Sequence, residues 1–144
     1  MHQALSSPAR SLTRNAAVLM AIGLLTGLFV SAAMTGKVNA DAHAALASHL
    51  NALLGCFWMV AVAYSMPMLR YGEVGLERLV WVVTIPNFSN WLVTAFKAFL
   101  KVPGVDLVGE GKNDLVFGLL TALVVLPSFA AAAAWVYGFF GKRS

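Results

Sequence analysis

The sequence predicts an all-α integral membrane protein, a four-transmembrane-helix bundle that forms a single domain over residues 1–144. Two observations lead to this prediction. Hydrophobic residues make up 60% of the chain and charged residues only 11%, against about 25% charged residues in an ordinary soluble domain. The hydrophobic residues also gather in four long runs that contain no Asp, Glu, Lys or Arg. Such runs are apolar all round, whereas the helices of a soluble bundle need polar faces.

Each run is long enough for one membrane crossing, because about 20 helical residues span the hydrocarbon core. The first run is Asn15 to Gly36 with 22 residues, and the second is Ala42 to Leu69 with 28. The third is Leu79 to Phe96 with 18, and the fourth is Leu115 to Gly141 with 27. We therefore expect transmembrane helices at about 15–36, 43–69, 77–100 and 114–140.

The connections between the expected helices are short, as a compact bundle requires. Gly104, Gly109 and Gly111 interrupt the chain between the third and fourth helices. Asn113 or Asp114 is then expected to cap the start of the fourth helix, because short polar side chains accept hydrogen bonds from the first helical amides.

Lysine and arginine residues near the helix ends indicate the orientation in the membrane. The side with both termini and the second loop carries six of them, and the other side carries three or four. This favours both termini in the cytoplasm and a location in a bacterial inner membrane. The alternative is that the first run is a secretory signal cleaved near Val38-Asn39-Ala40, but the run has the length of a spanning helix.

Several function classes are disfavoured. The net charge of +4 is scattered between apolar runs, so we expect no nucleic-acid partner. The chain has no phosphate-binding glycine loop, no HExxH motif and no CxxCH motif for covalent heme. Transport is disfavoured too, because no carboxylate lies in the middle of a span.

Polar side chains inside the expected second span are candidates for a site, since they are costly in lipid. His49 lies early in this span with Asn51 beside it, and Cys56 follows seven residues later on the same helical face as His49. The imidazole could bind a heme or metal, act as a base, or hydrogen-bond across helices.

The expected third span carries a polar stripe. Thr84, Asn87, Trp91, Thr94 and Lys97 recur at spacings of three and four, with Asn90 at the border. A stripe of this kind must face protein, water or a ligand, because lipid cannot satisfy it. Hydrogen bonds between helices and a ligand pocket both remain open.

Three segments together resemble the hydroxylaminobenzene mutase family and, more distantly, styrene oxide isomerase. They are residues 26–29, residues 47–55 around His49, and residues 87–94, which include Asn90-Trp91-Leu92 and Thr94. The resemblance covers about residues 20–140. It implies a small membrane isomerase without redox turnover.

In styrene oxide isomerases, heme b lies between the subunits of a trimer, a histidine binds the iron, and the ferric iron acts as a Lewis acid on the epoxide oxygen. By resemblance, His49 matches that histidine and Asn90 matches an asparagine of the pocket. The resemblance thus implies a homo-oligomer with heme b as cofactor.

The sequence departs from the family in two places. The family usually has Asn and Gly six and seven residues after the histidine, where this chain has Gly55 and Cys56. The isomerase has a tyrosine four residues after its asparagine, where this chain has Thr94, which agrees with the mutase-like branch. These departures put epoxide isomerisation in doubt.

The leading hypothesis is an isomerase that converts a small aromatic substrate, either an arylhydroxylamine to an aminophenol or an epoxide to an aldehyde. The alternatives are a non-catalytic heme-binding subunit and a purely structural membrane bundle. Under the leading hypothesis His49 binds the heme iron, Asn90 and Thr94 are the catalytic candidates, and the pocket includes Asn51, Cys56, Asn87 and Trp91.

Overall fold

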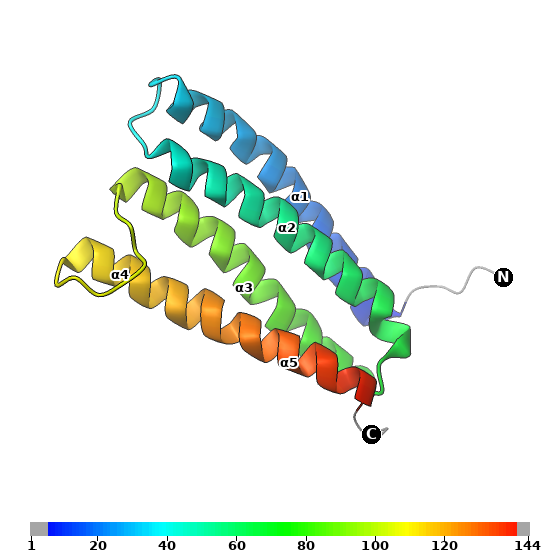
Figure 1. Ribbon diagram of the computed structural model, residues 1–144. Coiled ribbons are helices and arrows are strands. Elements are labelled where there is room, and N and C mark those ends of the chain that lie inside the picture. The colour runs from blue at the N-terminus through cyan, green and yellow to red at the C-terminus, as the bar shows by residue number, and fades with distance from the viewer. Residues whose placement is uncertain (1–5, 141–144) are drawn as a thin grey trace.

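The computed structural model describes residues 6–140 and confirms an all-helical fold, with no strand in the described part of the chain (Figure 1). Four helical segments are long and apolar enough to cross a membrane. The first three are α1 (Ser7–Met34), α2 (Ala42–Ser65), which continues into a 3-10 turn (Met66–Met68), and α3 (Glu73–Leu100). The fourth consists of α4 (Gly111–Leu120), a π-helical turn (Thr121–Val125) and α5 (Leu126–Phe140).

Helix α1 begins at Ser7, eight residues before the start expected from the charge-free run. The reason is a strong local start signal: the Ser6 hydroxyl accepts a hydrogen bond from the Ala9 amide, and Pro8 occupies the first turn. Arg10 and Arg14 therefore belong to the helix. A search for charge-free runs misses such a polar extension of a spanning helix.

The expectation that Asn113 or Asp114 caps the fourth span is wrong, because α4 begins at Gly111 with Glu110 at the cap position. Asn113 instead holds the preceding loop: its Oδ1 accepts from the Gly104 amide and its Nδ2 donates to the Asp106 carbonyl, both at 2.7 Å. Asp114 accepts hydrogen bonds from the amides of Val108 and Gly109. Both side chains serve the loop instead of the helix start.

Pro86 and Pro127 lie in the interior of two spans and have different surroundings. Pro86 is buried within α3, which continues through it without a break in the helix. Pro127 follows directly on the π-helical turn, in which the Leu126 amide reaches back five residues to the Thr121 carbonyl. Proline has no amide hydrogen and therefore leaves one helical carbonyl without its usual partner, and the wide turn next to Pro127 is one way to accommodate this.

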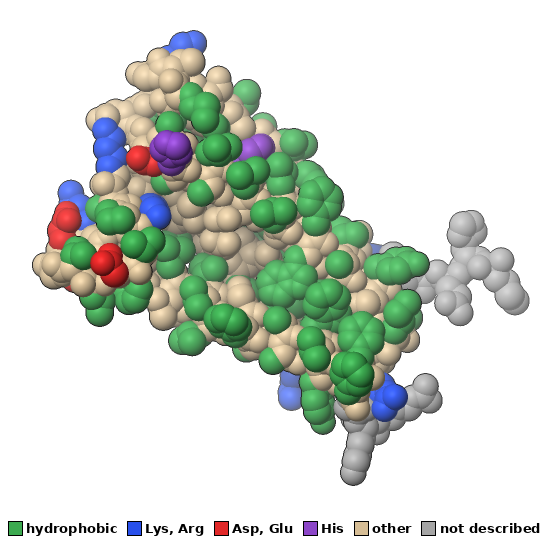
Figure 2. All heavy atoms as spheres, viewed as in Figure 1, with side chains coloured by type: hydrophobic (Ala, Val, Ile, Leu, Met, Phe, Trp, Pro, Cys, Tyr) green, Lys and Arg blue, Asp and Glu red, His purple; other side chains and the backbone are tan. Residues whose placement is uncertain are grey.

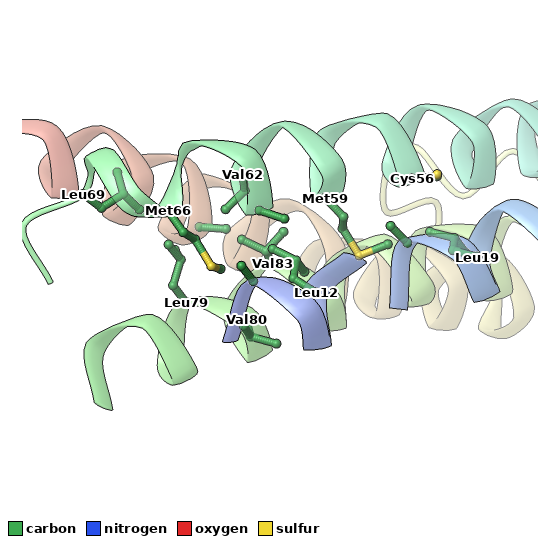
Figure 3. Packing of buried hydrophobic residues seen from close by; sticks show 14 of the residues in the cluster. Leu12, Leu19, Cys56, Met59, Val62, Met66, Leu69, Leu79, Val80 and Val83 are labelled. Carbon is green, nitrogen blue, oxygen red and sulfur yellow. The ribbon is translucent and has the colours of Figure 1, made fainter. Parts of the chain in front are cut away.

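The core lies where α1, α2 and α3 meet. Buried residues of α1 recur at alternating spacings of three and four from Ala9 to Ala33, the repeat of helices that pack side by side at a shallow angle. Many of them are small, which lets the backbones approach closely. Figure 3 shows the larger side chains of this core from the three helices pointing toward one another; they include Leu12, Leu19, Met59, Met66, Leu79 and Val83.

The outer surface suits a lipid environment. Leu24, Leu25 and Leu28 on α1 are each more than 60% exposed, as are Phe57 and Tyr64 on α2. In Figure 2 hydrophobic side chains cover the flanks of the molecule, whereas Lys, Arg, Asp and Glu gather toward its two ends. An apolar belt between charged ends is the pattern expected of a protein that spans a bilayer.

The helices are tied together at one end and fan apart toward the other (Figure 1). At the tied end the indole of Trp135 donates to the hydroxyl of Ser65 at 2.8 Å, and the hydroxyl of Tyr71 donates to the carbonyl of Ala134 at 2.7 Å. The amide of Arg70 also bonds the carbonyl of Gly138. Along the rest of its length α5 packs against α3, which leaves a space between α2 and α5.

Candidate functional site

A groove between α2 and α5, with α3 as its floor, is the main candidate for a site. It encloses about 290 Å³ at the level of the middle of the spans. Other cavities of the described chain, of about 390 Å³ and 500 Å³, lie at the ends of the helices beside charged side chains. The groove is lined by Asn51, Leu54, Gly55, Trp58, Pro86, Asn87, Asn90 and Ser128.

Asn51, Asn90 and Thr94 form one hydrogen-bonded cluster at this groove. The Nδ2 of Asn51 donates to the Oδ1 of Asn90 at 3.0 Å and to the Oγ1 of Thr94 at 3.1 Å. The Thr94 hydroxyl lies 3.4 Å from the same Asn90 oxygen. Because α2 supplies one residue and α3 the other two, the cluster joins the two helices and holds both amides in fixed positions at the groove.

Asn87 packs directly onto Gly55. Its Nδ2 donates to the Val83 carbonyl of its own helix at 2.7 Å, which sets the direction of the amide. A Cβ atom added to Gly55 would lie only 2.6 Å from the Oδ1 of Asn87. The absence of a side chain on α2 at this position is therefore what allows the amide from α3 to fit here.

His49 lies on the opposite side of α2, toward α1, and does not line the groove. Its Nδ1 is 2.7 Å from the carbonyl oxygen of Gly23, so Nδ1 carries the proton and donates it. The other ring nitrogen, Nε2, makes no hydrogen bond to the described residues. Since no described side-chain nitrogen or oxygen is both buried and unpaired, Nε2 reaches the protein surface.

The polar stripe of α3 is divided between two neighbouring helices. Thr84 and Trp91 face α1, where Thr84 accepts from Asn15 at 3.2 Å and the indole of Trp91 donates to Thr26 at 2.9 Å. Asn87 and Thr94 face α2. The stripe therefore holds the bundle together with some of its members and lines the groove with others.

Cys56 is buried among core residues and does not line the groove. Five residues that sequence reasoning did not place in the pocket line it: Leu54, Gly55, Trp58, Pro86 and Ser128. Ser128 follows Pro127, and that proline was the only available signal, since an interrupted helix in a membrane marks positions where polar groups gather. Nothing in the spacing of Trp58 distinguishes it from a lipid-facing aromatic residue.

A family model described as styrene oxide isomerase matches residues 8–140, nearly the whole chain. The chain belongs to the styrene oxide isomerase family. This confirms the expected resemblance to styrene oxide isomerase. No curated protein matches the chain, and no solved structure does.

At positions 55 and 94 this chain differs from the residues usual in the styrene oxide isomerase family, and the structure shows what surrounds each position. An asparagine at position 55, usual in the family, would collide with the amide of Asn87 in this chain. In this chain the space in front of Gly55 is occupied by the amide of Asn87, which comes from α3. Thr94, in place of the isomerase tyrosine, is buried and is turned to Asn51 and Asn90.

The described residues contain no group of three or more His, Cys, Asp or Glu side chains that could hold a metal ion. The family resemblance implies a cofactor that is bound through one imidazole, which does not require such a group. Metal-binding histidines usually donate their second ring N–H to a carbonyl or carboxylate, as His49 does to Gly23. The ring lies close to Gly27, where an added Cβ atom would be in ordinary contact at 3.5 Å from the Cε1 of His49.

Proposed function

We propose that this protein is a membrane isomerase that rearranges a small aromatic substrate in the groove between α2 and α5. The observation that carries the proposal is a row of three asparagines at a mid-membrane groove in a chain of the styrene oxide isomerase family. A volume of about 290 Å³ suits a molecule of one aromatic ring with a short substituent. The substrate is either an arylhydroxylamine, which gives an aminophenol, or an epoxide, which gives an aldehyde.

Both rearrangements conserve every atom of the substrate. In the first, the hydroxyl group leaves nitrogen for a ring carbon and the hydrogen of that carbon is transferred to nitrogen. In the second, one C–O bond of the epoxide breaks and a hydrogen shifts between the two carbons. Each passes through an electron-poor centre that water would trap, so a groove enclosed by apolar spans protects the reaction.

The residues of the groove have defined roles in this proposal. The amides of Asn51, Asn87 and Asn90 hold the polar group of the substrate, while Trp58 and Leu54 contact its ring. Thr94 keeps the amides of Asn51 and Asn90 in place. No lining side chain is titratable at neutral pH, so the protein orients the substrate and excludes water without acting as a strong acid or base.

We further propose that His49 binds heme b, the cofactor that the family resemblance implies. When bound, ferric heme would supply a Lewis acid for a substrate oxygen. The Nδ1 hydrogen bond to Gly23 would fix the ring and leave Nε2 as the ligand. His49 and the asparagines lie on different sides of α2, which supports a homo-oligomer in which the site is completed between copies.

The proposed location is a bacterial inner membrane with both termini in the cytoplasm. The beginning of α1 and the end of α5 lie at one end of the bundle (Figure 1). That end carries Arg10, Arg14, Arg70 and Arg78, which favours the cytoplasmic side.

The test is the visible spectrum of the detergent-purified protein, expressed with heme supplied, together with assays on phenylhydroxylamine and styrene oxide. The variant is His49→Ala, and the matched control is His43→Ala, an exposed histidine in the first turn of the same helix. We expect a Soret band and a rearranged product from the wild type and from H43A. H49A should lose both.

Each other outcome has a clear meaning. A colourless wild-type protein that still forms product would refute heme and leave a cofactor-free isomerase. A Soret band with reversible reduction but no product would indicate a non-catalytic heme-binding subunit. Neither colour nor product, with H49A unfolding at a lower temperature, would indicate a structural bundle.

A further inference from the structure

The three asparagines of the groove carry hydrogen-bonding atoms that no described residue uses. Asn51 uses its Nδ2 on Asn90 and Thr94, so its Oδ1 remains free. Asn87 uses its Nδ2 on the Val83 carbonyl, so its Oδ1 remains free as well. Asn90 uses its Oδ1, which leaves its Nδ2. Among the described residues, none of these three open atoms has a hydrogen-bond partner.

The number of open amide oxygens does not depend on which way the amides of the cluster are drawn. If Asn51 and Asn90 were both reversed, Asn90 would donate and Asn51 would accept, and the pair would again offer one open oxygen and one open nitrogen. Asn87 cannot be reversed, because the Val83 carbonyl only accepts hydrogen bonds. The groove therefore presents two open amide oxygens as acceptors, together with the second N–H of Asn87, the two N–H groups of the open amide nitrogen and the Ser128 hydroxyl.

The unpaired amide atoms are on residues that line the groove. All three asparagines line it, and no described side-chain oxygen or nitrogen is both buried and unpaired. Asn87 is only 7% exposed, so a ligand that fills the groove shields the open Oδ1 of Asn87 from water and from other hydrogen-bond donors. A ligand that donates no hydrogen bond would then leave this acceptor unsatisfied, which costs a factor of about ten or more in binding.

We propose that the groove selects an aromatic substrate that carries N–H or O–H donors, and so takes an arylhydroxylamine in preference to an epoxide. An arylhydroxylamine has an N–H and an O–H, so it can donate hydrogen bonds to open oxygens such as those of Asn51 and Asn87. An epoxide oxygen only accepts, so it can use Asn90 or Ser128 but leaves both amide oxygens unpaired. This inference rests on the proposed function for the reaction, whereas the preference for hydrogen-bond donors follows from the amides that line the groove.

The test compares two isomers of the same formula that do not rearrange: benzyl alcohol, which donates a hydrogen bond, and anisole, which only accepts. Their dissociation constants are measured by calorimetry with the wild-type protein in one detergent, and each value is corrected for partition into protein-free micelles. We expect benzyl alcohol to bind about tenfold more tightly than anisole. Equal affinities would overturn the inference.

The variant Asn87→Leu removes one open oxygen and keeps the branching and the number of side-chain heavy atoms, and the ratio of the two affinities should fall about threefold or more. The matched control is Asn15→Leu, an asparagine of α1 that bonds Thr84 and does not line the groove. In N15L the ratio should stay at the wild-type value. A ratio that stays unchanged in N87L as well would also overturn the inference, and the wild-type ratio decides it if N87L does not fold.

Failure of the inference and failure of the proposed function give different results. Suppose that the protein prefers donors, loses this preference in N87L and rearranges neither substrate. This result would support the selection of donors by the groove and refute the proposed isomerase activity. Rearrangement of styrene oxide with a higher kcat/KM than phenylhydroxylamine, without a donor preference, supports the isomerase and refutes the selection of donors.

Discussion

Gly55→Ala tests the contact between α2 and α3 at the floor of the groove. The added Cβ would lie 2.6 Å from the Oδ1 of Asn87 and 3.2 Å from its Cβ and Cγ, and real Cβ atoms do not approach others within 3.0 Å. Asn87 must then turn away and lose its hydrogen bond to the Val83 carbonyl. Overpacking costs about 1–3 kcal/mol and the lost hydrogen bond about 1 kcal/mol.

Part of this cost is offset, because alanine favours a helix over glycine by about 1 kcal/mol. We therefore expect G55A to lower the free energy of unfolding by about 2 kcal/mol. The matched control is Gly118→Ala in α4, where an added Cβ meets no atom within 4 Å. G118A should gain the helix propensity alone and unfold at the wild-type temperature or slightly above it.

The assay is thermal unfolding in one detergent, followed by far-ultraviolet circular dichroism for the wild type, G55A, N87A and the double variant. Because Asn87→Ala removes the colliding amide, the double variant should recover at least about 1 kcal/mol relative to the sum of the single effects. The reasoning is refuted if G55A unfolds together with G118A, or if the two substitutions act additively.

Two further predictions concern the ends of the bundle. Burial, and next the neighbouring Tyr137, raise the pKa of Tyr71, so the folded state holds this proton more tightly than the unfolded state. Its contribution to stability is full below the unfolded pKa of about 10 and is lost as pH rises toward the folded value. A titration of the unfolding temperature from pH 8 to 11 should therefore fall less steeply in Tyr71→Phe. Asn113→Ala leaves the Gly104 amide and the Asp106 carbonyl without their partner, which should cost about 1–3 kcal/mol and speed proteolysis of loop 101–110. Cleavage at the wild-type rate would contradict that role.

The four spans could be predicted from the sequence because lipid imposes one simple requirement, a long run of residues without charge. The ends of the helices could not, because they depend on local hydrogen bonds. The Ser6 cap extends α1 into a segment that contains Arg10 and Arg14. The side chain of Asn113 serves the loop before α4 because that loop folds back over it, a contact between residues nine apart.

The polar positions of the site could be predicted, but their partners could not. Spacing along α3 shows that Asn87, Trp91 and Thr94 lie near one another on the helix surface. It does not show that Trp91 meets α1 while Asn87 and Thr94 meet α2. The same holds for α2, where His49 and Asn51 are two residues apart and face different helices. Which neighbour each face meets is decided by the packing of all four spans.

The π-helical turn in the fourth span sets the register of everything that follows it. After Asn113, which serves the preceding loop, the buried positions of this span are Val116, Val124, Ala131 and Gly138, at successive spacings of eight, seven and seven. Seven residues make nearly two full turns of an α-helix, whereas eight overshoot by about 80°. The wide turn at Thr121–Val125 absorbs this one extra residue. The span can therefore be viewed as a regular helix with a single insertion, and a homologue that lacks one residue between positions 121 and 125 would keep the same face toward α3. A deletion after position 125 would instead turn the end of α5, with Gly138, away from Tyr71.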